Sequence, residues 1–221
     1  MNVSIVILAW NASHVTRACL NSLKPTLRKD DQVIVVDNGS TDDTAQMLTG
    51  FDWIDTVACQ KNYGFAGGNN RGAELAKHEV IIFLNNDTLF PDREWIGKLT
   101  DIFNSKDVVA SGPASDNVSG VQGEAKWAAS STSFFAVKRL VGFCLAVRRS
   151  TFEAVGGWDE GFGLGGYDDD DLCLRLSNYG HLVFCTRSFV SHVGHQTFDA
   201  NGLDWYAIQE SNRTYFERKH R

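Results

Sequence analysis

The residues best suited to chemistry are four consecutive carboxylates, Asp168 to Asp171, at the predicted start of a helix. The helix dipole stabilises acids in a first turn, so the run is also compatible with an ordinary charged helix start. Four acids in succession exceed what capping requires, and neighbouring carboxylates raise one another's pKa. One of them would then serve as a general base near neutral pH, especially beside a bound metal ion.

A second candidate group follows the apolar run Val80 to Leu84, which is typical of a strand buried on both faces. Asn85, Asn86 and Asp87 come directly after this run, and open α/β sheets bind ligands beyond the carboxyl ends of their strands. A short acid there suits a metal ion or a phosphate-linked ligand. The alternative is an ordinary turn, since Asn and Asp are turn residues.

Two histidines, His192 and His195, follow a later predicted strand. Either imidazole would complete a metal site begun by Asp87, and the alternative is a pair of loop histidines. One carboxylate, one imidazole, phosphate oxygens and water would together suit Mg²⁺ or Mn²⁺.

The stretch from Asn62 to Gly72 is rich in glycine and asparagine. Glycines that lead into a helix give backbone N–H groups close access to a phosphate or nucleoside, and the amides of Asn69 and Asn70 can hydrogen-bond a sugar or base. Rossmann dinucleotide binding is a poor fit, because the first turn, Ala9 to Ser13, lacks the glycines of that fingerprint. Hydride transfer is therefore disfavoured.

The elements that must position these residues alternate between strand and helix. Ser13 is predicted to cap the first helix, Ser40 with Asp43 to open the second, and Ala73 to Lys77 to form the third. Four such βα units in a row predict a parallel sheet. The predicted strands are Val3 to Ala9, Gln32 to Val36, Thr56 to Cys59 and the run at Val80.

Strand ends of a parallel sheet meet at one edge, so the polar residues after the strands are expected to gather there. The later chain is predicted to form a long connection over 108–135 that begins with a strand, and a helix opened by Ser150 with Glu153. Further helices are predicted at Asp92 to Asn104, Asp168 to Tyr179 and Asp204 to His220, and strands at Leu140 to Val147 and Leu182 to Cys185.

Composition limits the function classes. The chain has 221 residues, 43% hydrophobic and 22% charged, as expected for one globular domain, and its net charge of -6 gives no support for nucleic-acid binding. Its five cysteines form no CxxC pair, which argues against a zinc site or a disulfide framework and favours the cytosol. The first residues predict a strand and not a signal peptide, and no apolar stretch reaches the length of a membrane span.

Seven segments in order carry a family resemblance: VSIVILAWN, VIVVDNGSTDDT, NYGFAGGNNRG, FLNNDT, GGWDEGFG, DDDDLCLRL and SHVGH. The chain resembles family 2 glycosyltransferases of the GT-A fold, particularly bacterial rhamnosyltransferase-like members. The resemblance implies a single α/β domain with a Rossmann-like, mixed and mainly parallel sheet flanked by helices. Residues 1–88 would form its nucleotide-sugar-binding half and 89–221 its acceptor-binding and catalytic half.

The resemblance also implies roles for individual residues. Asp87 would be the metal-binding acid and His192 the late metal-binding histidine, Asp169 the catalytic base, and Asp168 its support where the family usually has Glu. Asn85 stands where many members have a further Asp, which removes one negative charge beside the metal. The implied nucleotide-sugar-binding residues are Ala9, Asn11, Asp37, Ser40, Asn62, Gly64, Gly68, Asn69, Asn70, Asn85 and Asn86, with Asp37 near the base or ribose.

The expected function is inverting transfer from a UDP- or dTDP-sugar to an acceptor hydroxyl, assisted by Mg²⁺ or Mn²⁺. The acceptor would be a saccharide or another hydroxyl compound, and a lipid-linked acceptor would bring the enzyme to a membrane surface without a span of its own. The stretch 110–136 and the loop before Asp168 are the expected acceptor region. The alternatives are a catalytically inert nucleotide-sugar binder, which would need no base, and a nucleotidyltransferase, which would carry a basic, glycine-rich first turn.

Overall fold

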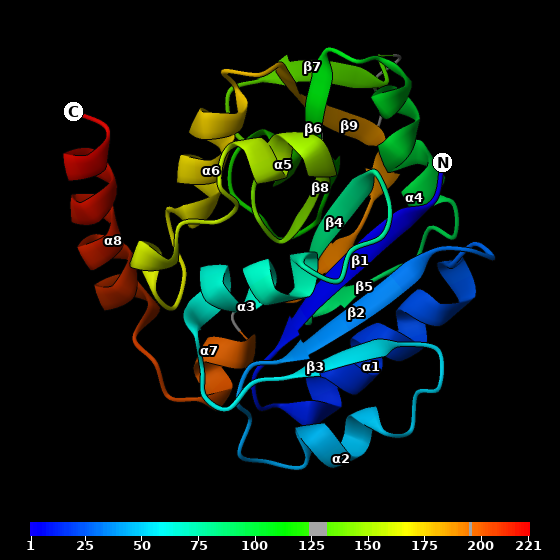
Figure 1. Cartoon of the computed structure of the whole chain (residues 1–221), viewed down its shortest axis with the longest axis vertical. Helices are drawn as coiled ribbons and strands as arrows, with labels where there is room; N and C mark the ends of the chain where they lie inside the picture. Colours follow the sequence, from blue (N-terminus) through cyan, green and yellow to red (C-terminus); the bar gives the residue numbers. More distant parts are fainter. Residues whose placement is uncertain (124–131, 195) are drawn as a thin grey trace.

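A single eight-stranded sheet forms the centre of the computed structural model, which describes residues 1–123, 132–194 and 196–221 (Figure 1). Its strands are β1 (Val3–Ala9), β2 (Gln32–Asp37), β3 (Asp55–Ala58), β4 (Val80–Asn85), β6 (Val108–Ala114), β7 (Phe134–Val137), β8 (Cys144–Arg148) and β9 (His181–Phe189). Their spatial order is β3-β2-β1-β4-β8-β6-β9-β7. Strands β1 to β4 pair in parallel, as the βα repeats predicted. Strand β8 lies antiparallel between β4 and β6, so the sheet is mixed and mainly parallel.

Helices cover both faces of this sheet. On one face lie α1 (Ser13–Leu23), α2 (Thr44–Leu48) and α4 (Trp95–Thr100). On the other lie α3 (Gly64–Ala73), α5 (Arg149–Ala154) and α6 (Asp168–Leu176). The remaining elements among the described residues are the two-stranded sheet of β5 (Thr88–Leu89) with β10 (Ser191–His192), the helices α7 (Gln196–Ala200) and α8 (Trp205–Lys219), and four short 3₁₀ helices at Lys24–Thr26, Asp101–Asn104, Val121–Gly123 and Glu160–Phe162.

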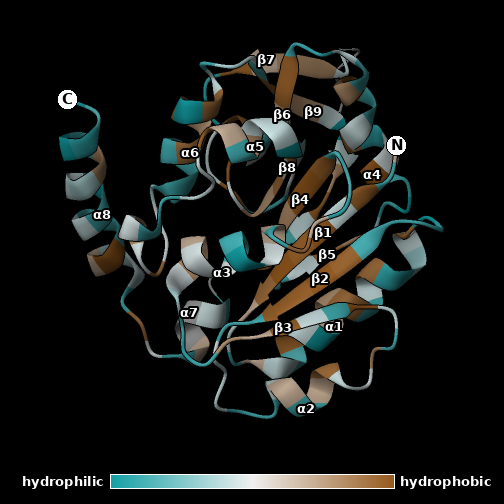
Figure 2. Cartoon of the chain, in the orientation of Figure 1, coloured by the Kyte–Doolittle hydropathy of each residue, from teal (hydrophilic) through white to brown (hydrophobic). Residues whose placement is uncertain are grey.

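The alternation of side chains along β1 explains why its apolar run is unbroken. Ile5 and Ile7 contribute to the hydrophobic cluster under α1, α2 and α4, whereas Val6 contributes to the cluster under α3, α5 and α6. Figure 2 shows the same apolar character in β2 and β4. A strand covered on both faces favours apolar residues at successive positions, which explains why the apolar runs in β1, β2 and β4 predicted these strands correctly.

The prediction for the glycine-rich region was wrong in one respect. The segment from Gly64 to Ala73 is itself the helix α3, and the expected helix at 73–77 does not form. Packing explains this outcome, because a Cβ at Gly68 would lie 2.2 Å from the Leu8 side chain and one at Gly72 would lie 2.3 Å from Val6. The glycines let the helix backbone approach β1 closely.

The three predicted side-chain caps were also wrong. The structure gives no side-chain cap hydrogen bond to α1, α2 or α5. The Ser13 hydroxyl instead donates to Asp43, and the Ser40 hydroxyl accepts from the backbone N–H of Asn11. These side chains connect neighbouring loops rather than cap their own helices.

Several boundaries differ from the prediction as well: α4 covers only Trp95–Thr100 of the helix predicted at 92–104, and β9 continues to Phe189 beyond the strand predicted at 182–185. Strand β8 begins at Cys144, so residues 140–143 precede it, and α6 ends at Leu176. The helix α8 begins and ends within one residue of the predicted range, with Asp204 accepting a hydrogen bond from Ala207 N–H as its cap. Within the described ranges, no helix is both long enough and apolar enough to cross a bilayer.

Candidate functional site

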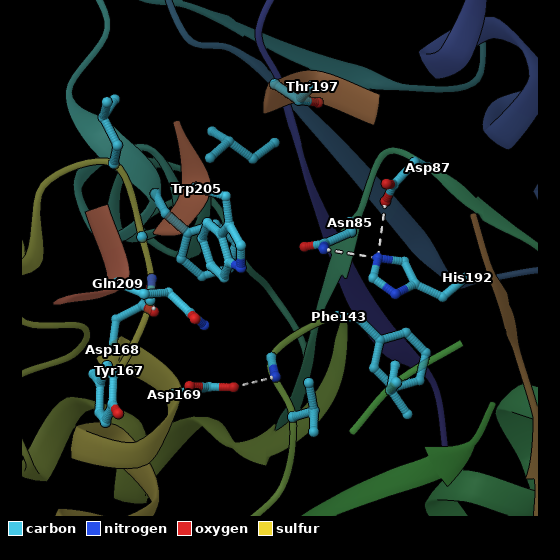
Figure 3. A pocket seen from close by; sticks show the side chains of 18 of the residues that line it. Asn85, Asp87, Phe143, Tyr167, Asp168, Asp169, His192, Thr197, Trp205 and Gln209 are labelled. Carbon is cyan, nitrogen blue, oxygen red and sulfur yellow. Dashed lines mark hydrogen bonds and ion pairs between the residues drawn. The ribbon is translucent and has the colours of Figure 1, made fainter. Parts of the chain in front are cut away.

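A cavity of about 590 Å³ lies beyond the carboxyl ends of β1, β2 and β4. Eight of the predicted site residues line it: Asn62, Gly64, Asn85, Asn86, Asp87, Asp168, Asp169 and His192. The structure therefore brings together side chains from β4, the start of α6 and β10, which are far apart in the chain (Figure 3).

Asp87 and His192 meet at one part of the cavity lining. The adjacent strands β5 and β10 pair His192 with Thr88, and His192 Nε2 lies 3.2 Å from Asp87 Oδ1. Among the described residues, Asp87 Oδ1 is buried and has no partner at hydrogen-bond geometry. An unpartnered buried carboxylate oxygen beside an imidazole fits a cation site.

The imidazole of His192 is held in place from several sides. Its Nδ1 lies 3.1 Å from the carbonyl oxygen of Asn117, and its ring packs 5.1 Å from that of Phe143 between centroids. If Nδ1 carries the proton and donates to this carbonyl, Nε2 presents its lone pair to Asp87 and to Asn85 Nδ2, 3.3 Å away. Burial is the largest single influence on His192 and opposes its protonation, but the contact with Asp87, the Asn117 backbone and the charge of Asp116 together raise the pKa of the imidazole.

Among the described residues, no third His, Cys, Asp or Glu gathers with Asp87 and His192 as a metal-binding cluster. Asn85 contributes an amide there instead of a carboxylate. The two protein ligands would leave the remaining positions of an octahedral ion to phosphate oxygens and water, which is the arrangement that Mg²⁺ favours.

Asp168 and Asp169 occupy the first turn of α6, at another part of the same cavity. Gly166 N–H donates to Asp168 Oδ1 at 2.8 Å, while Asp168 Oδ2 is buried without a partner. Gly142 N–H donates to Asp169 Oδ2 at 2.9 Å, and Asp170 N–H donates to Asp169 Oδ1 at 2.9 Å. Backbone donors thus fix the orientation of the Asp169 carboxylate.

Burial dominates the titration of these acids. It raises the pKa of Asp168 to about 7, and the negative charge of Asp169 adds to the effect. Burial also raises the pKa of Asp169, opposed by the Gly142 hydrogen bond and by Arg139. Burial and Asp169 raise the pKa of Asp170 to about 6. A carboxyl pair with raised pKa values is equipped to accept a proton near neutral pH.

The loops after β2 and β3 form a continuous hydrogen-bonded wall. The buried Asn38 donates to Asn62 Oδ1 at 2.9 Å and to the Gly64 carbonyl at 3.0 Å. Gly64 has φ of 78°, and Phe65 N–H reaches the carbonyl oxygen of Gly163 at 2.9 Å. This contact joins the loop at the start of α3 to the loop that precedes Asp168.

The other predicted nucleotide-sugar residues do not line this cavity. The side-chain amide of Asn70 donates from Nδ2 to the Trp158 carbonyl oxygen at 3.0 Å and accepts at Oδ1 from Trp158 N–H at 2.9 Å. Asp37 accepts from Ser40 N–H at 2.9 Å, and Asn69 donates to the Phe65 carbonyl. The residues outside the lining are Ala9, Asn11, Asp37, Ser40, Gly68, Asn69 and Asn70.

Sequence reasoning missed several lining residues: Trp10, Gly142, Phe143, Trp205 and Gln209. The loop before Asp168, which the sequence did single out, contributes Leu164 to Tyr167 to the lining, and Tyr167 has φ of 66°. Trp205 and Gln209 lie on α8, for which the sequence predicts a helix but no part in the site. His195 and residues 124–131 of the predicted acceptor region lie outside the described residues.

Comparisons with known proteins match the chain to two family models. A family model described as glycosyl transferase family 2 matches residues 4–155, and one described as the N-terminal domain of galactosyltransferase matches residues 128–196. The O-antigen biosynthesis protein RfbC of Myxococcus xanthus is 28% identical over 213 residues, covering 83% of this chain and 16% of that protein. The O-antigen chain rhamnosyltransferase WbaN of Salmonella anatum is 23% identical over 217 residues, covering 88% of this chain and 67% of that protein.

Among solved structures, the chain is similar to the mannosyltransferase PcManGT from Pyrobaculum calidifontis in complex with GDP-Man and Mn²⁺. The TM-score is 0.71 at 18% identity, over 86% of this chain and 56% of that chain, and this likeness shows the fold. The chain spans between 16% and 35% of the length of three of its curated relatives.

Proposed function

The chain belongs to glycosyl transferase family 2, and from that membership we propose that it transfers a sugar from a UDP- or dTDP-sugar to an acceptor hydroxyl with inversion. The observation that supports this proposal best is the single cavity lined by both the Asp87–His192 pair and the Asp168–Asp169 pair (Figure 3). Displacement at a sugar carbon requires a place for an anionic leaving group and a base for the incoming hydroxyl.

The base in this proposal is Asp169. The acceptor oxygen forms the new bond to the anomeric carbon, the bond from that carbon to the diphosphate oxygen breaks, and the hydroxyl proton passes to the Asp169 carboxylate. The hydrogen bonds from Gly142 and Asp170 N–H hold the carboxylate in one orientation. Asp168 is the proposed support of the base: it lies close enough to Asp169 for the charge of Asp169, together with burial, to raise the pKa of Asp168 to about 7.

Asp87 and His192 are the proposed ligands of a divalent cation, Mg²⁺ or Mn²⁺. When bound, the cation would supply positive charge against the departing nucleoside diphosphate. The unpartnered Asp87 Oδ1 and the Nε2 atom of His192 are the atoms that support this assignment. The Mn²⁺ named with the structurally similar mannosyltransferase is consistent with it.

The nucleotide sugar is proposed to bind over residues 1–88, against the wall formed by Asn38, Asn62 and Gly64. The names of the relatives RfbC and WbaN favour an O-antigen-like saccharide as acceptor, in polysaccharide or glycoconjugate synthesis. A lipid-linked saccharide would draw the protein to the cytoplasmic face of a membrane.

The test is a panel of UDP- and dTDP-sugars incubated with Mn²⁺ or Mg²⁺, scored for nucleoside diphosphate release by the intact protein and by Asp169→Asn. Asp101→Asn, an exposed acid outside the cavity, is the matched control. We expect metal-dependent release from at least one donor, lost in Asp169→Asn while donor binding persists. Release of pyrophosphate would indicate a nucleotidyltransferase, and donor binding with equal background release by all three proteins would contradict the assigned base.

A further inference from the structure

We propose that Trp205 and Gln209 on α8 form a binding site for a pyranose ring of the acceptor. Both residues line the cavity, and Figure 3 shows the Trp205 indole beside the Gln209 side chain, above the Asp168–Asp169 pair. The inference rests on the proposed function, since a transferase has a second substrate that must present a hydroxyl to its base.

The helix that carries these two residues is firmly attached. Asn212 Nδ2 donates to the carbonyl oxygens of Phe162 and Gly165 at 2.7 and 2.8 Å, and the amide is buried. Near the end of the helix, Lys219 Nζ lies 2.6 Å from Asp171 and 2.7 Å from Asp159. Helix α8 is therefore part of the cavity wall and not a loose tail.

The position of Trp205 relates directly to that of the base. A Cβ at Gly166 would lie 3.4 Å from Trp205 Cη2 and 3.5 Å from Gln209 Cγ, so both side chains pack over this glycine. The N–H of the same glycine donates to Asp168 at 2.8 Å. A group that rests on Trp205 therefore lies beside the carboxylate pair that must receive the acceptor proton.

The chemistry of the two side chains selects a neutral sugar. The indole face is electron-rich and apolar, and it matches the C–H face of a pyranose, while the Gln209 amide offers a donor and an acceptor to hydroxyl groups at the ring edge. Neither side chain carries a charge that would attract a phosphate. The diphosphate of the donor is expected instead at Asp87 and His192, so the Trp205 site is left to the acceptor.

The test measures binding of methyl pyranosides, added singly with UDP and Mn²⁺, by ligand-observed saturation-transfer NMR. The proteins are the intact chain, Trp205→Ala and Trp205→Phe. Tyr206→Ala is the matched control, since Tyr206 is an aromatic neighbour on the same helix, 82% exposed and outside the cavity lining. We expect at least one pyranoside to bind the intact chain, with affinity lost by about 10- to 100-fold in Trp205→Ala, largely restored in Trp205→Phe and unchanged in Tyr206→Ala.

Equal pyranoside binding by the intact chain and Trp205→Ala would overturn the inference, as would the absence of pyranoside binding to the intact chain. Binding of UDP with Mn²⁺ is measured on the same samples, and we expect Trp205→Ala to leave it unchanged. A loss of UDP affinity in this variant with pyranoside binding retained would place Trp205 at the donor and also overturn the inference. Failure of the proposed function has a separate signature, because the intact chain would then release no nucleoside diphosphate from any donor.

Discussion

At the scale of single residues, the two acids at the start of α6 differ in how their oxygens are satisfied. Both oxygens of Asp169 accept backbone hydrogen bonds, whereas one oxygen of Asp168 is buried without a partner. Ionisation of a buried carboxyl group is unfavourable when one of its oxygens has no hydrogen-bond partner. A negative charge on Asp168, beside the proposed base, therefore destabilises the folded chain.

Stability is expected to depend on pH at Asp168. The folded pKa of about 7 lies above the value of about 3.9 for an unfolded aspartate, so the folded chain binds more protons between these values and loses stability as pH rises through them. Asp168→Asn removes this loss and keeps an oxygen for Gly166 N–H. We expect the variant to be more stable than the intact chain by on the order of 2 kcal/mol at pH 8, with little difference at pH 4.

Urea unfolding at the two pH values measures this effect. Asp101→Asn, at an exposed acid, serves as the control. A stability gain of Asp168→Asn that is equal at pH 4 and pH 8 would exclude ionisation of Asp168 as its cause.

The rate is expected to change with pH in the opposite direction to stability. The general base must be deprotonated, so kcat/KM should rise with pH as the Asp168–Asp169 pair is deprotonated, toward pH of about 7. Asp168→Asn removes a neighbouring negative charge and should shift this rise to lower pH. The measurement is a pH profile of nucleoside diphosphate release for both proteins, and coincident profiles would show that Asp168 does not influence the base.

At the scale of elements, the strands could be predicted because a strand buried on both faces has a local signature, the unbroken apolar run of β1 or β4. Caps could not, because Ser13 and Ser40 bond residues about 30 positions away, and local spacing contains no information on those partners. The predicted helix started too late in the chain, because glycine has a low intrinsic helix propensity. In the structure, close packing of α3 on β1 outweighs this low propensity.

Two Gly→Ala substitutions, one in α3 and one in α4, test whether close packing explains the glycines of α3. Gly68→Ala should destabilise the fold by about 1 to 3 kcal/mol, since its Cβ would lie 2.2 Å from Leu8 Cδ1 and 3.1 Å from Asn38 Nδ2. Gly97→Ala in α4, where no atom lies within 4 Å, should stabilise by about 0.5 to 1 kcal/mol through helix propensity. Thermal unfolding of both variants tests this, and a stabilising effect of Gly68→Ala would contradict the packing account of α3.

The candidate site shows the same division between local and distant information. Asp87, Asp168 and Asp169 could be recognised because each lies next to a strand end or helix start in the chain. Trp205 and Gln209 could not, because their place at the cavity depends on how α8 docks, through Asn212, onto a loop about 50 residues earlier. Only the tertiary structure contains that contact.

At the scale of the whole molecule, α8 is attached to α6 through a buried carboxylate. Asp171 is fully buried and contacts Arg175, Lys219 and His220, at 2.6, 2.6 and 2.8 Å. A buried acid of this kind is retained only when cations surround it. The contacts couple the docking of α8 to the helix that starts at the proposed base.

Weakening this cluster is expected to loosen α8 before the rest of the fold. Lys219→Ala removes the contacts to Asp171 and Asp159 and should lower stability by about 1 to 2 kcal/mol, with faster amide hydrogen exchange across α8. Arg213→Ala is the control, because its ion pairs to Glu210 and Glu217 lie within α8. Hydrogen exchange that increases equally in both variants would argue against a special role of the buried cluster.

The order of the cavity-lining residues along the chain has a consequence for recombination between related genes. One part of the cavity lining, with Asn38, Asn62 and Asp87, is encoded before residue 90, and the other, which runs from Asp116 to Gln209, after residue 115. Recombination between two related genes in the interval would exchange one part and preserve the other. If the halves have the proposed roles, such chimeras would pair an old donor with a new acceptor, provided that the incoming half brings a histidine at the place of His192.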